Sequence, residues 1–290
     1  MNYGITLPTA GPLATPDALT TVATRAEALG YTSVWVTDHI AMPLSIQSAY
    51  PYTANRRAPW DPTIPYLDAF TALTWAAAVT RRALLGTSVL VLPMRPPLAV
   101  AKTAGTLDYL SGGRVILGIG AGWMAEEFEL LGQPFGDRGR RTVEAVRVLR
   151  ACWAGDPVSF VGESYQFAPF AMAPKPPQGA RLPVLGGGES DAALRRVAEV
   201  CDGWHPLGLG PDAFARARAR LERFVGRAGR SMAEILLTIR PGLGNPLTPE
   251  LVSGYEALGA RLLVADVNYR QLTLTQALAE IERLARSLRL

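Results

Sequence analysis

Short apolar runs alternate with stretches of helical periodicity along the whole chain. The runs lie at residues 3–7, 33–37, 83–92, 114–119, 182–185, 203–205, 235–239 and 262–265. The nearly continuous apolar run at 83–92 is typical of a strand that is covered on both faces of a parallel sheet. The stretch at 274–288 places its apolar residues at i, i+4 and i+7, which indicates an amphipathic helix. The pattern therefore predicts eight strands that alternate with helices.

The boundaries of several helices are marked by their capping residues. Thr15 and Pro16 are typical of a helix start, and Gly30 is typical of a helix end. The predicted helices span residues 16–29, 65–80, 97–110, 124–131, 138–154, 191–200, 211–225, 251–258 and 274–288. Eight strand–helix units over this length predict one (β/α)8 barrel domain that covers residues 1–290. A doubly wound open sheet is the alternative, since one sequence does not give the strand order.

Residues 155–181 interrupt the alternation of strands and helices. Two short apolar segments, at 158–161 and 165–167, predict a hairpin, and a proline-rich segment follows them. We interpret this stretch as an insertion after the fourth strand–helix unit rather than as a domain boundary.

The composition is that of a globular protein, with 49% hydrophobic and 19% charged residues. No apolar run approaches the roughly 20 residues of a membrane helix, and no signal peptide is recognised. Cys152 and Cys201 are isolated in the sequence, which argues against a zinc site or a disulfide framework and favours a cytoplasmic protein without a metal. The net charge of +4 comes from scattered arginines. We therefore expect no nucleic-acid partner, whereas a small anionic ligand would suit the charge.

The chain has 2 histidines, and both end a predicted strand. His39 closes the second apolar run and His205 closes the sixth. Ligands and chemistry collect at the carboxyl ends of parallel strands, and histidine titrates near neutral pH. His39 is therefore a candidate proton donor, with Asp38 setting its charge state. The simpler alternative is a strand-end histidine that is satisfied by backbone groups.

Two glycine-rich loops also follow predicted strands. Residues 118–123 read Gly-Ile-Gly-Ala-Gly-Trp, and residues 186–190 read Gly-Gly-Gly-Glu-Ser at the start of a helix. Glycine lets a ligand approach the backbone, and amides at a helix N-terminus bind anions. We interpret the second loop as a phosphate site, although Glu189 would then have to point away. A turn that needs small residues is the alternative for both loops.

Several of these segments together resemble the bacterial luciferase-like monooxygenase superfamily, especially its branch that uses the deazaflavin coenzyme F420. The resemblance is carried by residues 35–39, 86–89, 107–114, 118–123, 126–128, 186–188 and 198–204. Their order and spacing match over most of the chain. The stretch from Ser-Gly-Gly-Arg at 111–114 to Gly-Ile-Gly-Ala-Gly-Trp at 118–123 is its most specific part.

The resemblance implies a barrel that holds a flavin or deazaflavin at the carboxyl ends of its strands. His39 matches the histidine that lies near the hydride-transferring carbon, and it is the catalytic candidate together with Asp38. A non-prolyl cis peptide of the family would here join Ser88 to Val89, against the cofactor ring. The cofactor-binding residues that the resemblance implies are Asp38, Ser88, Val89, Gly120, Ala121, Gly122, Trp123, Gly186, Gly187, Gly188 and Ser190.

The chain departs from the sugar-phosphate dehydrogenases of this branch at two positions. They carry a glutamate where this chain has Trp123, and a tryptophan near the position of Pro43. Glucose 6-phosphate oxidation is therefore not implied. Glu126 lies about one helical turn further on and could reach inward, but we assign it no catalytic role.

The leading hypothesis is an oxidoreductase that transfers a hydride between coenzyme F420 and a small organic substrate, through reduction of an activated C=C or C=N bond or oxidation of an alcohol. The alternative is a monooxygenase that uses reduced FMN and oxygen. A non-catalytic barrel and a metal-dependent hydrolase are disfavoured. Arg56, Arg57 and Arg95 are candidates for holding the polyglutamate tail of F420, with a solvated surface as the alternative. Dimerisation with a second copy is expected from the family alone.

Overall fold

The eight predicted strands form a closed barrel. We describe a computed structural model over residues 1–53, 55–58, 61–243 and 245–290. The barrel strands are β1 (Asn2–Thr6), β2 (Ser33–Val36), β3 (Leu84–Thr87), β5 (Val115–Gly120), β8 (Val184–Gly186), β9 (Gly203–Trp204), β10 (Leu236–Ile239) and β11 (Leu262–Ala265). They follow the order β3-β2-β1-β11-β10-β9-β8-β5, and β3 also pairs with β5. All these pairings are parallel. The predicted α/β barrel is thus confirmed, and the open doubly wound sheet is excluded.

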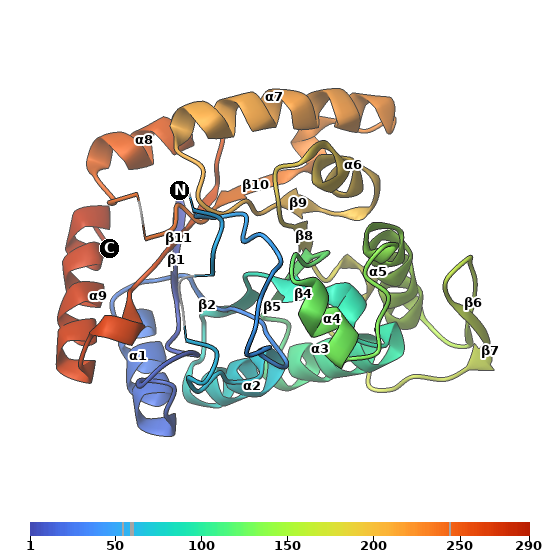
Figure 1. Cartoon of the computed structure of the whole chain (residues 1–290), viewed down its shortest axis with the longest axis horizontal. Helices are drawn as coiled ribbons and strands as arrows, with labels where there is room; N and C mark the ends of the chain where they lie inside the picture. Colours follow the sequence, from blue (N-terminus) through green and yellow to red (C-terminus); the bar gives the residue numbers. More distant parts are fainter. Residues whose placement is uncertain (54, 59–60, 244) are drawn as a thin grey trace.

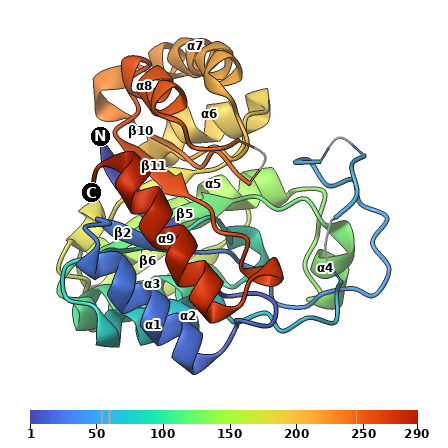
Figure 2. The ribbon, with the colours of Figure 1, turned by 90° about the vertical axis from the view of Figure 1, so that its left-hand side faces the viewer.

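Helices surround the barrel on its outer side (Figure 1). They are α1 (Pro16–Ala28), α2 (Ala69–Val79), α3 (Pro97–Ser111), α4 (Ala125–Leu130), α5 (Arg138–Ala154), α6 (Asp191–Val200), α7 (Pro211–Arg227), α8 (Pro249–Ala257) and α9 (Leu274–Leu288). Figure 2 shows α4 apart from this outer ring, beside the long loop that follows β2. In the described part of the chain, no helix is long and apolar enough to cross a membrane.

Helix α2 begins later than the sequence pattern predicts. Its N-cap is Asp68, whose carboxylate accepts a hydrogen bond from the Thr71 amide at 2.8 Å. The residues just before it have other partners. The Leu67 amide donates to the Thr9 carbonyl at 2.8 Å, and Tyr66 forms an antiparallel bridge with Ala10. The predicted start at residue 65 was therefore wrong, because Pro65, Tyr66 and Leu67 pair with the backbone of residues 9–11 and do not extend the helix.

The apolar run at 83–92 does not form one strand. β3 ends at Thr87, and a short strand, β4 (Leu90–Val91), pairs with β5 beyond the cis peptide that joins Ser88 to Val89. Gly118 on β5 makes this path possible, because a β-carbon there would lie 2.0 Å from the Thr87 carbonyl oxygen. The run thus delivers Ser88 and Val89 to the end of the barrel.

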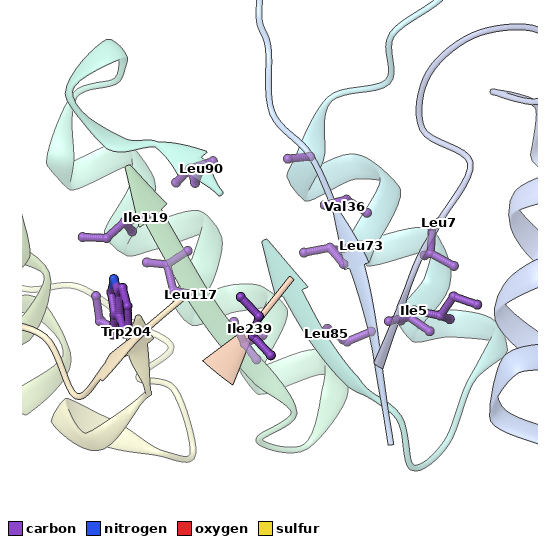
Figure 3. Packing of buried hydrophobic residues seen from close by; sticks show 14 of the residues in the cluster. Ile5, Leu7, Val36, Leu73, Leu85, Leu90, Leu117, Ile119, Trp204 and Ile239 are labelled. Carbon is purple, nitrogen blue, oxygen red and sulfur yellow. The ribbon is translucent and has the colours of Figure 1, made fainter. Parts of the chain in front are cut away.

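The apolar side chains form two layers. The inside of the barrel is filled by a cluster of Trp35, Ile116, Leu185, Leu262 and Val264. The larger layer lies between strands and helices, as Figure 3 shows for residues such as Leu73 on α2 and Leu85 on β3. The filled interior makes the barrel a packed core, so ligands bind at its rims rather than through it.

The segment at 155–181 forms an antiparallel hairpin outside the barrel sheet. Strand β6 (Val158–Val161) pairs with β7 (Gln166–Phe170) beyond α5 (Figure 1). The carboxylate of Glu144 on α5 ties the hairpin turn to that helix, since it accepts hydrogen bonds from the Glu163 and Ser164 amides. The two strands match the hairpin that the sequence pattern predicts.

The Gly86→Ala substitution tests the packing inside the barrel. A β-carbon at Gly86 would lie 2.2 Å from Trp35 Cε3, and this indole is fully buried. We expect the variant to lose about 3 kcal/mol of unfolding free energy in urea titrations, because overpacking displaces a rigid ring. Gly226→Ala is the matched control: nothing lies within 4 Å of its added β-carbon, so stability should hold or rise. Equal effects of the two substitutions would contradict the packing account.

Candidate functional site

The loops that the sequence analysis singled out meet at the carboxyl ends of the strands. Backbone hydrogen bonds link neighbouring strand ends: the Ser88 amide donates to the Val36 carbonyl at 2.7 Å, and the Gly187 amide donates to the Ile119 carbonyl at 2.8 Å. The His205 amide donates to Gly186 at 2.9 Å. The loops after β2, β3, β5 and β8 therefore open onto one rim of the barrel.

The imidazole of His39 is held by a carboxylate that the sequence analysis missed. His39 Nδ1 lies 2.7 Å from Glu127 Oε2, and the other carboxylate oxygen accepts hydrogen bonds from the amides of Ile40 at 2.7 Å and Ala41 at 3.2 Å. The Glu127 side chain is 2% exposed, against 10% for His39. Because a carboxylate only accepts, Nδ1 carries a proton in this contact. In the neutral ring, Nε2 is then the acceptor nitrogen.

Asp38 does not contact the His39 ring in the way the sequence analysis expected. Its carboxylate receives both arms of the Arg95 guanidinium, each at 2.7 Å, and the Val91 amide at 2.9 Å. The Asp38 side chain is fully buried. The expected influence on His39 therefore belongs to Glu127, whereas Asp38 fixes the backbone around β4.

The Arg95 guanidinium is engaged by carboxylates within the chain. Its guanidinium also lies 3.6 Å from Asp68, and its side chain is 13% exposed. The expectation that Arg95 holds a polyglutamate tail was wrong, since two carboxylates already neutralise it. Arg56 and Arg57, the other two candidates, are exposed in the loop after β2.

Trp123 and Glu126 take separate positions. The half-buried Trp123 ring meets the His39 ring edge-on, with centroids 6.4 Å apart, and the Tyr50 ring at 5.0 Å. Glu126 accepts hydrogen bonds from the amides of Gln47 at 2.7 Å and Ser48 at 2.9 Å. Glu126 thus anchors the loop, and an aromatic side chain borders the histidine.

The glycines of the two loops make space for Val89. A β-carbon at Gly120 would lie 2.8 Å from Val89 Cγ2, and one at Gly187 would lie 3.1 Å from Val89 Cγ1. Gly122 has a positive φ of 85°, which glycine adopts without strain. Ala121 is half-buried between these glycines. The loops after β5 and β8 therefore close around the Val89 side chain.

A buried polar network supports Ser88 from below. His205 Nε2 lies 2.8 Å from the Ser88 hydroxyl, and His205 Nδ1 lies 2.7 Å from the Thr238 hydroxyl. Thr238 donates its own proton to the Trp204 carbonyl, so Nδ1 of His205 donates to Thr238 and Nε2 accepts from Ser88. The Trp35 ring stacks on His205 at a centroid distance of 4.8 Å. His205 is thus a neutral structural histidine rather than a second catalytic group.

An ion pair completes this network. Arg240 donates to the Ser88 carbonyl at 2.8 Å and to its hydroxyl at 3.2 Å. The same guanidinium binds Asp266 through Nε and Nη2, at 2.9 Å and 2.5 Å. The Asp266 side chain is 7% exposed. This pair places a fixed positive charge under the peptide that joins Ser88 to Val89.

The loop after β8 opens α6 as predicted. Ser190 is the N-cap, and its hydroxyl accepts a hydrogen bond from the Ala193 amide at 3.2 Å. The Trp204 indole donates to the Gly188 carbonyl at 2.8 Å, and Glu189 is exposed. Gly186 packs against α6: a β-carbon at this position would lie 2.6 Å from Val197 Cγ2. The helix N-terminus therefore faces the rim, and its phosphate role stays a prediction.

Sequence signals for the missed residues did exist. Arg240 directly follows β10, and Asp266 directly follows β11, the same strand-end position that pointed to His39. The sequence points to Glu127 less clearly. It is adjacent to Glu126 in the first turn of α4, and only the orientation of that helix shows which of the two carboxylates faces His39. Tyr66, whose hydroxyl bonds that of Thr37, gave no signal at all.

A separate cavity of about 500 Å³ lies at the other end of the barrel. It is lined by residues that precede or begin strands, including Met232, Leu236 and Arg261. None of the predicted site residues lines it. In the described part of the chain, no group of three or more histidine, cysteine or acidic side chains is arranged to hold a metal.

Comparisons with known proteins agree on the family. A family model described as luciferase-like monooxygenase matches residues 1–243. An uncharacterised protein from Mycobacterium tuberculosis is 41% identical over 210 residues, which is 72% of each chain. A second protein from that organism, provisionally named a coenzyme F420-dependent oxidoreductase, is 33% identical over 244 residues, covering 76% of this chain and 70% of the relative.

Solved structures show the same fold at low sequence identity. The coenzyme F420-dependent tetrahydromethanopterin reductase from Methanopyrus kandleri superposes with a TM-score of 0.75 at 18% identity, covering 99% of this chain and 97% of the reductase. A monooxygenase from Streptomyces bottropensis superposes with a TM-score of 0.76 at 19% identity, covering 99% and 98%. These two likenesses support the barrel architecture.

Acid should destabilise the protein partly through His205. Burial and the nearby Arg240 charge lower the pKa of His205 to about 3, from 6.5. The unfolded chain binds a proton below pH 6.5 and the folded one does not, so stability falls between pH 6.5 and 3, by up to about 1.4 kcal/mol per unit. In urea titrations, the deficit of His205→Gln relative to wild type should shrink by about 3 kcal/mol between pH 7 and pH 4. A deficit that is independent of pH would contradict this.

Proposed function

The chain belongs to the luciferase-like monooxygenase family, and we propose that it transfers a hydride between coenzyme F420 and a small organic substrate. The observation that carries this proposal is the His39–Glu127 pair at 2.7 Å, held beside the glycine-lined border of Val89. The relative that is 33% identical and provisionally named for F420 supports the choice of cofactor.

The residues at the rim fit a flat cofactor with a phosphate on its side chain. Gly120 and Gly187 leave room for the Val89 side chain, which could then form one face of a ring site. The N-terminus of α6 and the half-buried guanidinium of Arg138 suit an anion. We assign the ring to Ser88, Val89 and residues 120–123, and the phosphate to residues 186–190. When bound, the deazaflavin would supply or accept the hydride.

His39 would act on the heteroatom of the substrate. Glu127 fixes the ring orientation and keeps a proton on Nδ1, so Nε2 alone exchanges a proton with the substrate. In reduction, a proton from Nε2 would complete the product; in alcohol oxidation, Nε2 would accept the hydroxyl proton. Glu127 is a positioning residue in this scheme, since its carboxylate touches His39 and the backbone.

The surroundings of His39 favour an apolar organic substrate. Trp123 and Tyr66 each meet the His39 ring edge-on, at 6.4 Å and 5.4 Å between centroids. Burial raises the pKa of Tyr66, so its hydroxyl stays neutral and donates to Thr37. Enones, imines and secondary alcohols of moderate size match these walls.

An FMN-dependent monooxygenase is the second candidate function. Its support is the family itself and the barrel shared with the Streptomyces bottropensis monooxygenase. The same rim residues would hold FMN, which also carries a ring and a phosphate. The two functions therefore differ in the bound cofactor and in the need for oxygen.

Cofactor choice tests the proposal directly. The purified protein is titrated without oxygen with oxidised F420 and, separately, with FMN, and binding is followed by fluorescence. We expect F420 to bind at least about tenfold more tightly than FMN, a difference of about 1.4 kcal/mol. Reduced F420 should then be consumed when an enone such as 2-cyclohexen-1-one is added. Preference for FMN, with oxygen consumption by the reduced complex, would overturn the F420 assignment.

Two neighbouring glutamates separate the roles of site and loop. Glu127→Gln should lower kcat at least about tenfold with less than a threefold change in KM, because the amide no longer fixes the Nδ1 proton of His39. His39→Ala should lower kcat by about 10²–10⁴. Glu126→Gln is the control, since Glu126 contacts loop amides, and its kcat should stay within threefold of wild type. Equal losses in the two glutamine variants would contradict the assigned role of Glu127.

A further inference from the structure

Arg196 on α6 is a half-buried cation without a protein partner. Among the described residues, its guanidinium has no hydrogen bond and no ion pair. Nearby arginines are paired: Arg147 binds Glu199, and Arg150 binds Asp202. Placing an unpaired guanidinium in a partly desolvated position is costly. A partner outside the chain would remove that cost.

The Arg196 side chain reaches the border between the two glycine loops. Together with Gly120, Ala121, Gly187 and Thr142, it lines a cavity of about 10 Å³. Such a volume takes about one water-sized group, which is also the size of a single phosphate oxygen. The β-carbon that Gly139 lacks would lie 3.2 Å from Arg196 Nη1, so the guanidinium lies at the start of α5.

A second cation faces the same place. Arg138 is the first residue of α5, and its guanidinium donates to the Gly122 carbonyl at 3.1 Å and the Phe135 carbonyl at 2.9 Å. It forms no ion pair with a carboxylate in the described ranges. Burial, together with repulsion from Arg138, lowers the pKa of Arg196. Two guanidinium groups with no carboxylate between them give this region a positive charge that a bound anion would neutralise.

We propose that Arg196 is an anion-binding residue that contacts the phosphate ester on the side chain of the cofactor. This inference rests on the proposed function, because it takes its ligand from the same site. The planar guanidinium offers several N–H donors to phosphate oxygens, and the N-terminus of α6 adds backbone donors on the same side. Arg196 comes from the second turn of α6, outside the loop at 186–190 that carries the phosphate prediction.

Phosphate-bearing and phosphate-free ligands test this role by binding alone. The probes are F420 and FMN, together with riboflavin and the deazaflavin riboside that lacks the phosphate. Arg196→Leu should weaken binding of the phosphate-bearing probes about tenfold to a hundredfold and leave the phosphate-free probes within about threefold. Arg196→Lys should give an intermediate loss, since lysine keeps the charge without the fork.

A neighbouring arginine gives the matched control. Arg195 lies over the Phe224 ring at 5.1 Å and is exposed, so Arg195→Leu should leave binding of every probe unchanged. Because Arg196 has no protein partner, Arg196→Leu should unfold in urea at the same or a higher midpoint than wild type. A binding loss that is equal for phosphate-bearing and phosphate-free probes would overturn the proposal.

The outcomes separate this inference from the proposed function. If wild type binds FMN but not F420, the F420 assignment fails, and FMN still tests Arg196. If wild type binds F420 and Arg196→Leu binds it within twofold of wild type, only the role of Arg196 fails. If wild type binds neither cofactor, both proposals are overturned.

Discussion

The hydrogen bonds between β3 and β5 are the constraint on which the site depends. Together with the pairing of the first and last strands, β1 and β11, they close the sheet, and closure brings the ends of all the parallel strands to one rim. In an open sheet, His39 after β2 and the loop after β8 would lie on strands far apart. In the barrel, β3 and β5 lie between them, and residues 88–89 and 118–123 connect the two regions.

The rim combines a rigid floor with a bordering loop. His205, Thr238, Arg240 and Asp266 form a hydrogen-bonded network below Ser88, in which burial and the Arg240 charge lower the pKa of His205 to about 3. The histidine at the opening is held differently, by the carboxylate of Glu127 on α4, the helix that Figure 2 shows apart from the outer ring. The two histidines of the chain thus have similar positions at strand ends and different environments: His205 is buried in the polar network, whereas His39 is 10% exposed beside Glu127.

The sequence pattern was sufficient for the architecture, and it predicted that the candidate residues share one edge of the sheet. Eight apolar runs separated by helical periodicity require a closed or doubly wound parallel sheet, and strand-end residues then share one edge. Pairings between side chains were less predictable. Asp38 is adjacent to His39 in sequence, yet its carboxylate binds Arg95 and the Val91 amide, which lie more than 50 residues away along the chain. Glu127 lies 88 residues from His39, and only the packing of α4 brings them together.

A crystal structure with oxidised F420 bound tests the central claim most directly, namely that this rim holds the cofactor ring beside His39. The account predicts electron density for the deazaflavin ring at the carboxyl ends of the strands, between Val89 and Trp123, with the phosphate toward α6. Density in the cavity at the opposite end of the barrel, near Leu236 and Arg261, would contradict it.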